Sequence, residues 1–79
     1  MGEISIDIVI RLLSLLLEGP KKKTELWRFS RMNYNSFVRH LNVLVERGLV
    51  AERDGYYMLT ERGVRETKEI LEWLKRTFQ

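Results

Sequence analysis

The dipeptide Asp54-Gly55 is the feature of this sequence that most restricts the fold. Asp-Gly accepts the positive φ angles that a tight two-residue hairpin turn requires, so it is the strongest short-range hairpin signal in a sequence. Apolar-rich runs flank it at residues 49–53 and 56–59. We therefore predict a two-stranded ribbon. Because an isolated hairpin is only marginally stable in water, the ribbon must pack on the rest of the chain or contact a partner.

A helical pattern precedes the ribbon at the start of the chain. The first predicted helix covers residues 5–18 and ends at Gly19-Pro20, a common stop signal. Its apolar residues lie nearly all the way round the helix, which indicates one face on its own core and a second face on another chain or another long helix. These residues are Ile6, Ile8, Val9, Ile10, Leu12, Leu13, Leu15, Leu16 and Leu17.

A short second helix follows the three lysines at positions 21–23. We predict Thr24 as its N-cap, because a threonine hydroxyl accepts a hydrogen bond from the first free N–H groups of a helix. Leu26, Trp27 and Phe29 are expected to face inward, since their helical spacing is more typical of core packing than of a base-stacking platform.

The third predicted helix spans residues 34–47, with Asn33 as its N-cap and Gly48 at its end. On a helical wheel its inner stripe consists of Phe37, Leu41, Leu44 and Val45, with Val38 at the border. The opposite arc is mostly polar and holds Asn35, Ser36, Arg39, Asn42, Val43 and Glu46, with His40 and Arg47 at its flank. A helix with this division has one face on the core and one face open to a partner.

After the ribbon, Thr60 is the predicted N-cap of a fourth helix that runs to near the C-terminus. Its apolar stripe comprises Val64, Thr67, Leu71, Leu74 and Phe78, while Ile70 and Trp73 fall on a second face. Within the ribbon, alternation places Leu49, Tyr57 and Leu59 on the inner side. A second apolar face on the last helix favours a contact with another subunit.

The predicted order is helix, helix, turn, helix, hairpin, helix. Two helices joined by a short turn, with the second presenting a polar face, form a helix-turn-helix, and a hairpin directly after them forms a wing. The predicted fold class is mainly α with a small β-hairpin, a winged helix-turn-helix. A length of 79 residues indicates one domain, 1–79, in which residues 60–79 contribute a C-terminal helix to dimerisation.

Two segments resemble the archaeal winged-helix DNA-binding proteins, which include small regulators encoded by plasmids and viruses. Gly48-Leu49-Val50 is similar to the end of the recognition helix in that family, and residues 57–63, Tyr-Met-Leu-Thr-Glu-Arg-Gly, are similar to its Tyr-x-Leu-Thr-x-x-Gly entry to the last helix. The resemblance covers residues 8–75. It implies a homodimeric regulator of transcription that binds double-stranded DNA, with a last helix that pairs with its mate in several members.

Candidate DNA-binding residues form two groups. Asn and Arg side chains match the hydrogen-bonding edges of adenine and guanine in the major groove, and the helix-turn-helix presents the N-terminal half of its second helix there. The first group is Tyr34, Asn35, Ser36, Arg39, His40 and Asn42. The second group, which would hold phosphates or enter the minor groove from the wing, is Lys21, Lys22, Lys23, Arg28, Arg31 and Arg53. An ordinary solvated helix face and a solvated lysine loop are the alternatives.

Composition supports neither a metal site nor catalysis. The chain has no cysteine and one histidine, so His40 is interpreted as a surface residue near phosphate, and no cofactor is predicted. No nucleophile-and-base arrangement or glycine-rich phosphate loop is present in the sequence. The 14 Lys and Arg against 11 Asp and Glu suit an anionic partner without proving one. The apolar run at 4–17 is interrupted by charges and too short to span a bilayer, so a cytoplasmic, nucleoid-associated protein is expected.

Two other functions stay open at this point. One is architectural, chromatin-type DNA binding without sequence preference, against which the Asn, Ser and Arg side chains of the polar arc argue. The other is a protein-interaction module that docks a larger assembly through the first and fourth helices. Under the DNA-binding hypothesis the same helices form the homodimer, with Ile70 and Trp73 at the contact.

Overall fold

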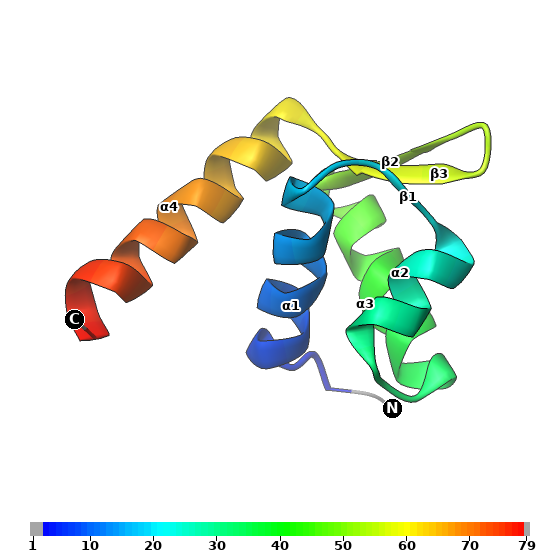
Figure 1. Cartoon of the computed structure of the whole chain (residues 1–79), viewed down its shortest axis with the longest axis horizontal. Helices are drawn as coiled ribbons and strands as arrows, with labels where there is room; N and C mark the ends of the chain where they lie inside the picture. Colours follow the sequence, from blue (N-terminus) through cyan, green and yellow to red (C-terminus); the bar gives the residue numbers. More distant parts are fainter. Residues whose placement is uncertain (1–2, 79) are drawn as a thin grey trace.

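The computed structural model describes residues 3–78 and confirms the winged helix-turn-helix order. Its elements are α1 (Ile6–Leu17), β1 (Lys21–Lys22), α2 (Lys23–Ser30), α3 (Tyr34–Glu46), β2 (Val50–Arg53), β3 (Tyr56–Leu59) and α4 (Glu61–Phe78). Figure 1 shows α1, α2 and α3 gathered on one side of the small sheet, while α4 leaves the sheet beside the end of α1 and diverges from α1 toward its own C-terminal end.

The wing sheet has three strands, where the sequence predicted two. β2 and β3 pair antiparallel, with Arg53 opposite Tyr56. β1 pairs with the other edge of β3, with Lys22 also opposite Tyr56, which makes the strand order β1-β3-β2. A two-residue strand has too few residues to show an alternating pattern, so sequence periodicity missed it. The third strand supplies the support that an isolated hairpin lacks. The turn is as predicted, with φ values of 54° at Asp54 and 83° at Gly55.

The core lies between the first three helices and the base of the sheet. Its fully buried apolar residues are Leu12, Leu13, Leu16, Leu26, Phe37, Leu41, Leu44 and Val50. Leu49, Tyr57 and Leu59 are partly buried against this cluster, as the alternation of the ribbon predicted. The wing is therefore held by its inner side chains as well as by its strand pairing.

The starts of α3 and α2 show one confirmed and one incorrect capping prediction. The Asn33 Oδ1 atom accepts hydrogen bonds from the N–H groups of Asn35 at 2.8 Å and Ser36 at 3.3 Å, as predicted. In α2 the N-cap is Lys22, so the predicted cap Thr24 lies inside the first turn. The Lys22 N–H donates to a carboxylate oxygen of Glu25 at 3.1 Å, and this bond replaces the expected threonine cap.

The aromatic residues of α2 are not in the core. Leu26 and Ser30, four residues apart, are both 0% exposed and are the only fully buried residues of α2. Trp27 is 39% exposed and Phe29 is 53% exposed, so the prediction that both face inward was wrong. A helix of two turns that rests on one i, i+4 pair leaves its other positions outside, whatever their hydrophobicity.

The inner stripe of α3 contains the histidine that was predicted at the surface. The buried residues of this helix are Phe37, His40, Leu41 and Leu44. His40 is 1% exposed, whereas Val45, predicted in the stripe, is 38% exposed. The imidazole Nδ1–H donates to the Ser36 carbonyl at 2.7 Å and Nε2 accepts from the Ser5 N–H at 2.9 Å. These two partners compensate for burial of the polar ring, and they exclude His40 from DNA contact.

The segment that ends α3 is joined to the start of α4 by two side-chain hydrogen bonds, and a third bond caps α4. Thr60 Oγ1 donates to the Gly48 carbonyl at 2.6 Å and accepts from the Gly63 N–H at 3.0 Å, which confirms Thr60 as the N-cap. Arg62 Nη1 donates to the Arg47 carbonyl at 3.1 Å. The carbonyls of Arg47 and Gly48, directly after α3, and one of the first N–H groups of α4 are thereby satisfied, so the two helices meet in a fixed junction.

α4 contacts the core through its first half, where Ile70 is partly buried against the core, contrary to the prediction that it lies on a second, outer face. Gly63 and Thr67 are its buried residues. Toward the other end, Trp73 is 52% exposed and Phe78 is 75% exposed. The prediction that Phe78 faces inward was wrong, because the last turns of α4 diverge from α1, as Figure 1 shows. No helix within residues 3–78 has both the length and the apolar character needed to cross a membrane.

Candidate nucleic-acid interface

The outer arc of α3 is open to solvent and carries hydrogen-bonding side chains. Asn35, Arg39 and Asn42 are exposed, and Ser36 is half-buried beside the His40 ring. The one acidic residue of the helix, Glu46, lies at the C-terminal end. The half that starts at Asn33 therefore presents donors and acceptors without a carboxylate that would repel phosphate.

An aromatic cluster joins α2 to the start of α3. The rings of Trp27 and Tyr34 meet edge to face, with centroids 5.2 Å apart and planes at 83°. The indole Nε1–H donates to the Met32 carbonyl at 2.8 Å, and Lys23 Nζ lies 5.9 Å from the centre of the Tyr34 ring. These contacts fix the turn of the helix-turn-helix and bring a lysine ammonium beside Tyr34, which is 46% exposed.

The three lysines before α2 have different surroundings. Lys21 Nζ donates to the Leu15 carbonyl at 3.0 Å and lies 3.4 Å from a carboxylate oxygen of Glu18. Its side chain is only 14% exposed, so it completes the C-terminal end of α1 and is not a phosphate contact, contrary to the prediction. Lys22 is exposed and Lys23 half-buried, and both remain candidates.

A row of three side chains crosses the outer part of the wing. Strand pairing places Tyr56 between Arg53 on β2 and Lys22 on β1. Directly opposite residues of adjacent strands point to the same side of a sheet. Lys22 Nζ lies 5.8 Å from the centre of the Tyr56 ring, which is 40% exposed. Sequence reasoning found the two cations but missed Tyr56, because the row exists only once β1 joins the sheet.

The remaining cations of the prediction, Arg28 and Arg31, are exposed on α2 and the following turn. Together with Thr24 and Trp27 they line a hollow of about 320 Å³. α2 and β2 both pack against α3, and both α2 with its turn and the wing carry exposed cationic side chains, although Glu52 and Asp54 are exposed beside Arg53. Cations on the elements that adjoin α3 suit a polyanionic partner.

Comparison with known proteins places this arrangement in a family. Residues 4–78 match the sequence profile of a family described as winged helix-turn-helix. The chain belongs to this winged helix-turn-helix family. No curated protein matches it in sequence.

Solved structures with the same fold include two proteins of similar size. The transcriptional repressor BigR from Xylella fastidiosa has a TM-score of 0.78 and 22% identity, with 96% of this chain and 80% of that chain covered. Quinone-bound YodB from B. subtilis has a TM-score of 0.67 and 22% identity, with 82% and 78% covered.

A third structure shares only a part with this chain. CalO1, a methyltransferase in calicheamicin biosynthesis, has a TM-score of 0.59 and 28% identity over 72% of this chain, but the match spans 17% of CalO1. All three likenesses concern the winged helix-turn-helix fold, and fold alone does not assign an activity.

Proposed function

We propose that this protein binds double-stranded DNA in a sequence-specific manner and regulates transcription. The exposed polar arc of α3, together with the exposed cations of α2, its turn and the wing, is the observation that carries the proposal. In a helix-turn-helix the second helix lies in the major groove, and its N-terminal residues contact base edges. The similarity in fold to BigR, described as a transcriptional repressor, supports the same type of role.

The proposed base contacts come from the N-terminal half of α3. Arg39 is suited to a bidentate pair with guanine, and Asn35 and Asn42 to adenine, each worth about 1–3 kcal/mol of discrimination between bases. Ser36 and Tyr34 complete the set, with the Tyr34 hydroxyl directed to a base or a phosphate. Phosphates are held by Lys22, Lys23, Arg28, Arg31 and Arg53, the last from the wing on the backbone or in the minor groove. Log affinity then falls with log salt by about 0.9 per neutralised phosphate.

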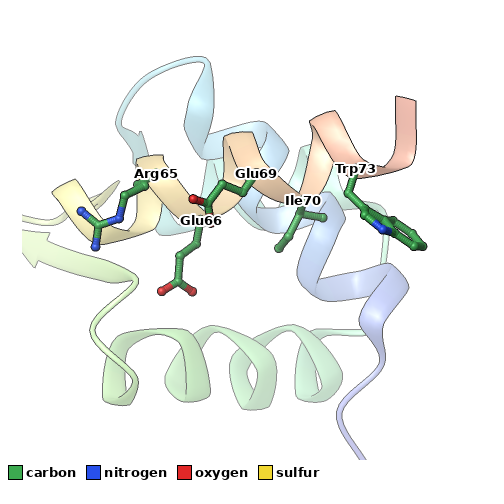
Figure 2. Close-up of a pocket in the computed structure, with 5 residues that line it drawn as sticks. All are labelled: Arg65, Glu66, Glu69, Ile70 and Trp73. Carbon is green, nitrogen blue, oxygen red and sulfur yellow. The ribbon is translucent and has the colours of Figure 1, made fainter. Parts of the chain in front are cut away.

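We also propose that two copies pair through α1 and α4. Figure 2 shows Glu66, Ile70 and Trp73 projecting from one side of α4, where they line a hollow of about 360 Å³ together with Arg65 and Glu69. Ile6 on α1 is 68% exposed, so both helices carry apolar side chains that the chain itself does not cover. A two-fold dimer would bring two α3 helices to half-sites one helical turn of DNA apart, or a multiple of it. Sedimentation equilibrium should then give a mass twice the 9.5 kDa chain.

The proposal is tested first with selected DNA. Bound fragments are recovered from a random duplex pool, and the recovered site is competed against bulk DNA. A sequence-specific protein should bind its selected site at least about a thousandfold more tightly than bulk DNA. A much smaller ratio would indicate the architectural type of DNA binding. Absence of any duplex binding at low salt would reject DNA binding altogether.

Arg39→Ala tests the proposed reading mode. Affinity for the selected site should fall about 10- to 100-fold, and affinity for bulk DNA much less, because only the specific complex loses a bidentate base contact. Lys68→Ala, which removes a positive charge from an exposed position on α4, is the control and should leave both affinities nearly unchanged. Equal losses for both DNAs would make Arg39 a phosphate contact.

The expected cellular location follows from the proposed DNA partner. A DNA-binding regulator acts where the genome lies, so we expect the protein in the cytoplasm and at the nucleoid. The resemblance of residues 8–75 to archaeal regulators leads us to expect an archaeal cell or one of its plasmids or viruses.

A further inference from the structure

The hollow on the outer side of α2 is a site with a definite chemistry. It measures about 320 Å³ and is lined by Thr24, Trp27, Arg28 and Arg31, all of which are exposed. Among residues 3–78 the three ion pairs involve other side chains, so neither guanidinium has a carboxylate partner there. Two uncompensated guanidinium groups beside a hydroxyl favour an anion, and the planar Arg fork fits phosphate oxygens especially well.

The indole of Trp27 defines what accompanies the anion. Its Nε1–H is already bonded to the Met32 carbonyl at 2.8 Å, so the indole has no donor left for a phosphate oxygen. What it offers the hollow is apolar ring surface. The backbone of Arg31 is fixed next to Trp27. Its backbone N–H donates to the Trp27 carbonyl at 3.3 Å, and its φ of 55° lies in the left-handed region at the end of α2. The hollow is therefore suited to a phosphate attached to an apolar group, such as a phosphodiester joined to a deoxyribose.

The position of the hollow indicates that the phosphate comes from a DNA backbone. Through the contact of Trp27 with Tyr34 it adjoins the N-terminal end of α3. In a helix-turn-helix complex the helix before the recognition helix crosses the DNA backbone at the edge of the major groove. A backbone strand bordering the groove that receives α3 would therefore run past the outer side of α2.

We propose that this hollow binds one phosphodiester group of the duplex, clamped by Arg28 and Arg31, while the Trp27 ring packs against the adjoining deoxyribose. The inference rests on the proposed function, because it needs α3 in the major groove. The inference adds Trp27 to the residues that contact DNA, and it means that Arg28 and Arg31 bind the same phosphate group. Trp27 thus has two roles, since the same ring holds the turn between α2 and α3 and contacts the backbone.

The test uses Trp27 as its own reporter. The chain has two tryptophans, and Trp73→Phe removes the other while keeping an aromatic ring at that position. A fluorophore-labelled duplex carrying the selected site is titrated with this variant, and its anisotropy reports DNA binding. Emission of Trp27 is recorded in the same titration. We expect a change in Trp27 emission that saturates together with the anisotropy.

The two readouts separate the two proposals. If anisotropy saturates while Trp27 emission stays constant, the duplex binds elsewhere and the inference about the hollow is overturned, although the proposed function stands. If the unmodified protein, titrated in parallel because Trp73 belongs to the proposed subunit contact, shows no anisotropy change at low salt, the proposed function fails and the inference fails with it.

Charge removal tests the shared phosphate. Arg28→Gln combined with Arg31→Gln should reduce the slope of log affinity against log salt by about 0.9, the value for one phosphate contact. Lys68→Gln on α4 is the charge control and should leave the slope unchanged. Trp27→Phe should weaken binding about threefold to tenfold at constant slope, because a smaller ring covers less of the sugar. A double arginine variant with the slope of the unmodified protein would overturn the inference.

A free anion is the other source of the same chemistry. Inorganic phosphate, titrated into the Trp73→Phe protein at constant ionic strength, should change Trp27 emission only at concentrations far above those of duplex phosphate that saturate it. An equal response at equal phosphate concentration would overturn the inference, because the hollow would then be a site for small anions and not for the DNA backbone.

Discussion

α3 and α4 both present one face to solvent, but they are held in opposite ways. α3 is fixed along its length, by the Asn33 cap, by four buried side chains and by the bonds from Thr60 and Arg62 to the two carbonyls directly after it. α4 is fixed over its first half only, where Gly63 and Thr67 are buried and Ile70 is partly buried, and its last turns carry the exposed rings of Trp73 and Phe78. The exposed face of α3 is polar, and that of the free half of α4 is partly apolar.

The difference indicates two kinds of partner. A polar face on a rigid helix keeps its side chains pre-arranged for hydrogen bonds, so little ordering entropy is lost when a duplex binds. An apolar face on a helix end with little support from its own chain gains from burial against another surface. We interpret α3 as the DNA-reading element and the free half of α4 as the subunit contact. Four substitutions, each with a comparison variant, test this division in order of decreasing effect.

Gly63→Ala should have the largest effect, because it pushes the anchored start of α4 off the wing. A Cβ atom at Gly63 would lie 2.0 Å from the Leu49 carbonyl oxygen, which is backbone and cannot rotate away. We expect the free energy of unfolding to fall by about 3 kcal/mol, even after the gain of about 1 kcal/mol in helix propensity. Urea denaturation followed by circular dichroism measures it.

Gly55→Ala is the matched comparison for that experiment. A Cβ at Gly55 meets no atom within 4 Å, and only its φ of +83° opposes the change. The expected loss is about 1–2 kcal/mol, from left-handed strain alone. If Gly63→Ala proves no more harmful than Gly55→Ala, the junction between α3 and α4 is looser than described and the contrast between the helices weakens.

His40→Ala tests the inner side of α3. Removing the ring deletes the acceptor for the Ser5 N–H and leaves a cavity beside Phe37 and Leu41, so we expect a loss of about 2–3 kcal/mol in the free energy of unfolding. Asn42→Ala, on the exposed arc, should change stability by less than about 0.5 kcal/mol and yet weaken specific DNA binding about tenfold. A His40→Ala protein that keeps its stability and loses only DNA affinity would place this histidine at the interface after all.

Trp73→Ala tests the free half of α4. The side chain is 52% exposed in the single chain, so the stability of the monomer should change by less than about 0.5 kcal/mol. Self-association should weaken about 30-fold, which corresponds to about 2 kcal/mol, because large aromatic anchors dominate interface energies. Sedimentation over a range of concentrations provides the measurement, with Lys68→Ala as the control on the same helix. An unchanged association constant would mean that α4 does not form the subunit contact.

The sequence predicted the helices and the turn well, because single residues mark their ends. Asn33, Gly48, Asp54-Gly55 and Thr60 each have one dominant local preference, and the structure uses each as that preference indicates. Within α3 the exposed candidates Asn35, Arg39 and Asn42 were also identified correctly as solvent-facing, since a strong apolar stripe opposes them.

Two of the misses share one cause, which is that hydrophobicity was taken as a measure of burial. The apolar Trp27 is exposed and the polar His40 is buried, the opposite of what their polarity suggested. Helical spacing from Leu26 and Phe37 decides which positions of α2 and α3 face the core. Lys21 and β1 were missed for a different reason. Their partners, the end of α1 and the edge of β3, come from tertiary structure, and a local pattern of three lysines contains no information about either.

Thr67→Val should have the smallest effect and the opposite sign. Thr67 is 2% exposed between α1 and α4, and within the described residues its hydroxyl oxygen has no hydrogen-bond partner. The adjoining gap, lined by apolar residues such as Leu13 and Ile70 together with Ser14, has essentially no room for a water molecule. Replacing the unpaired hydroxyl with a methyl group of similar size should raise the free energy of unfolding by about 1 kcal/mol.

Thr67→Ser is the control that keeps the hydroxyl and removes the methyl group. It should lower the free energy of unfolding by about 1 kcal/mol, because a buried methyl is lost and the unpaired oxygen remains. Destabilisation by Thr67→Val would show that the hydroxyl has a partner in solution. The first half of α4 would then be held by a polar contact, as α3 is. The two helices would be fixed in similar ways, and their main difference would be the partner that each binds.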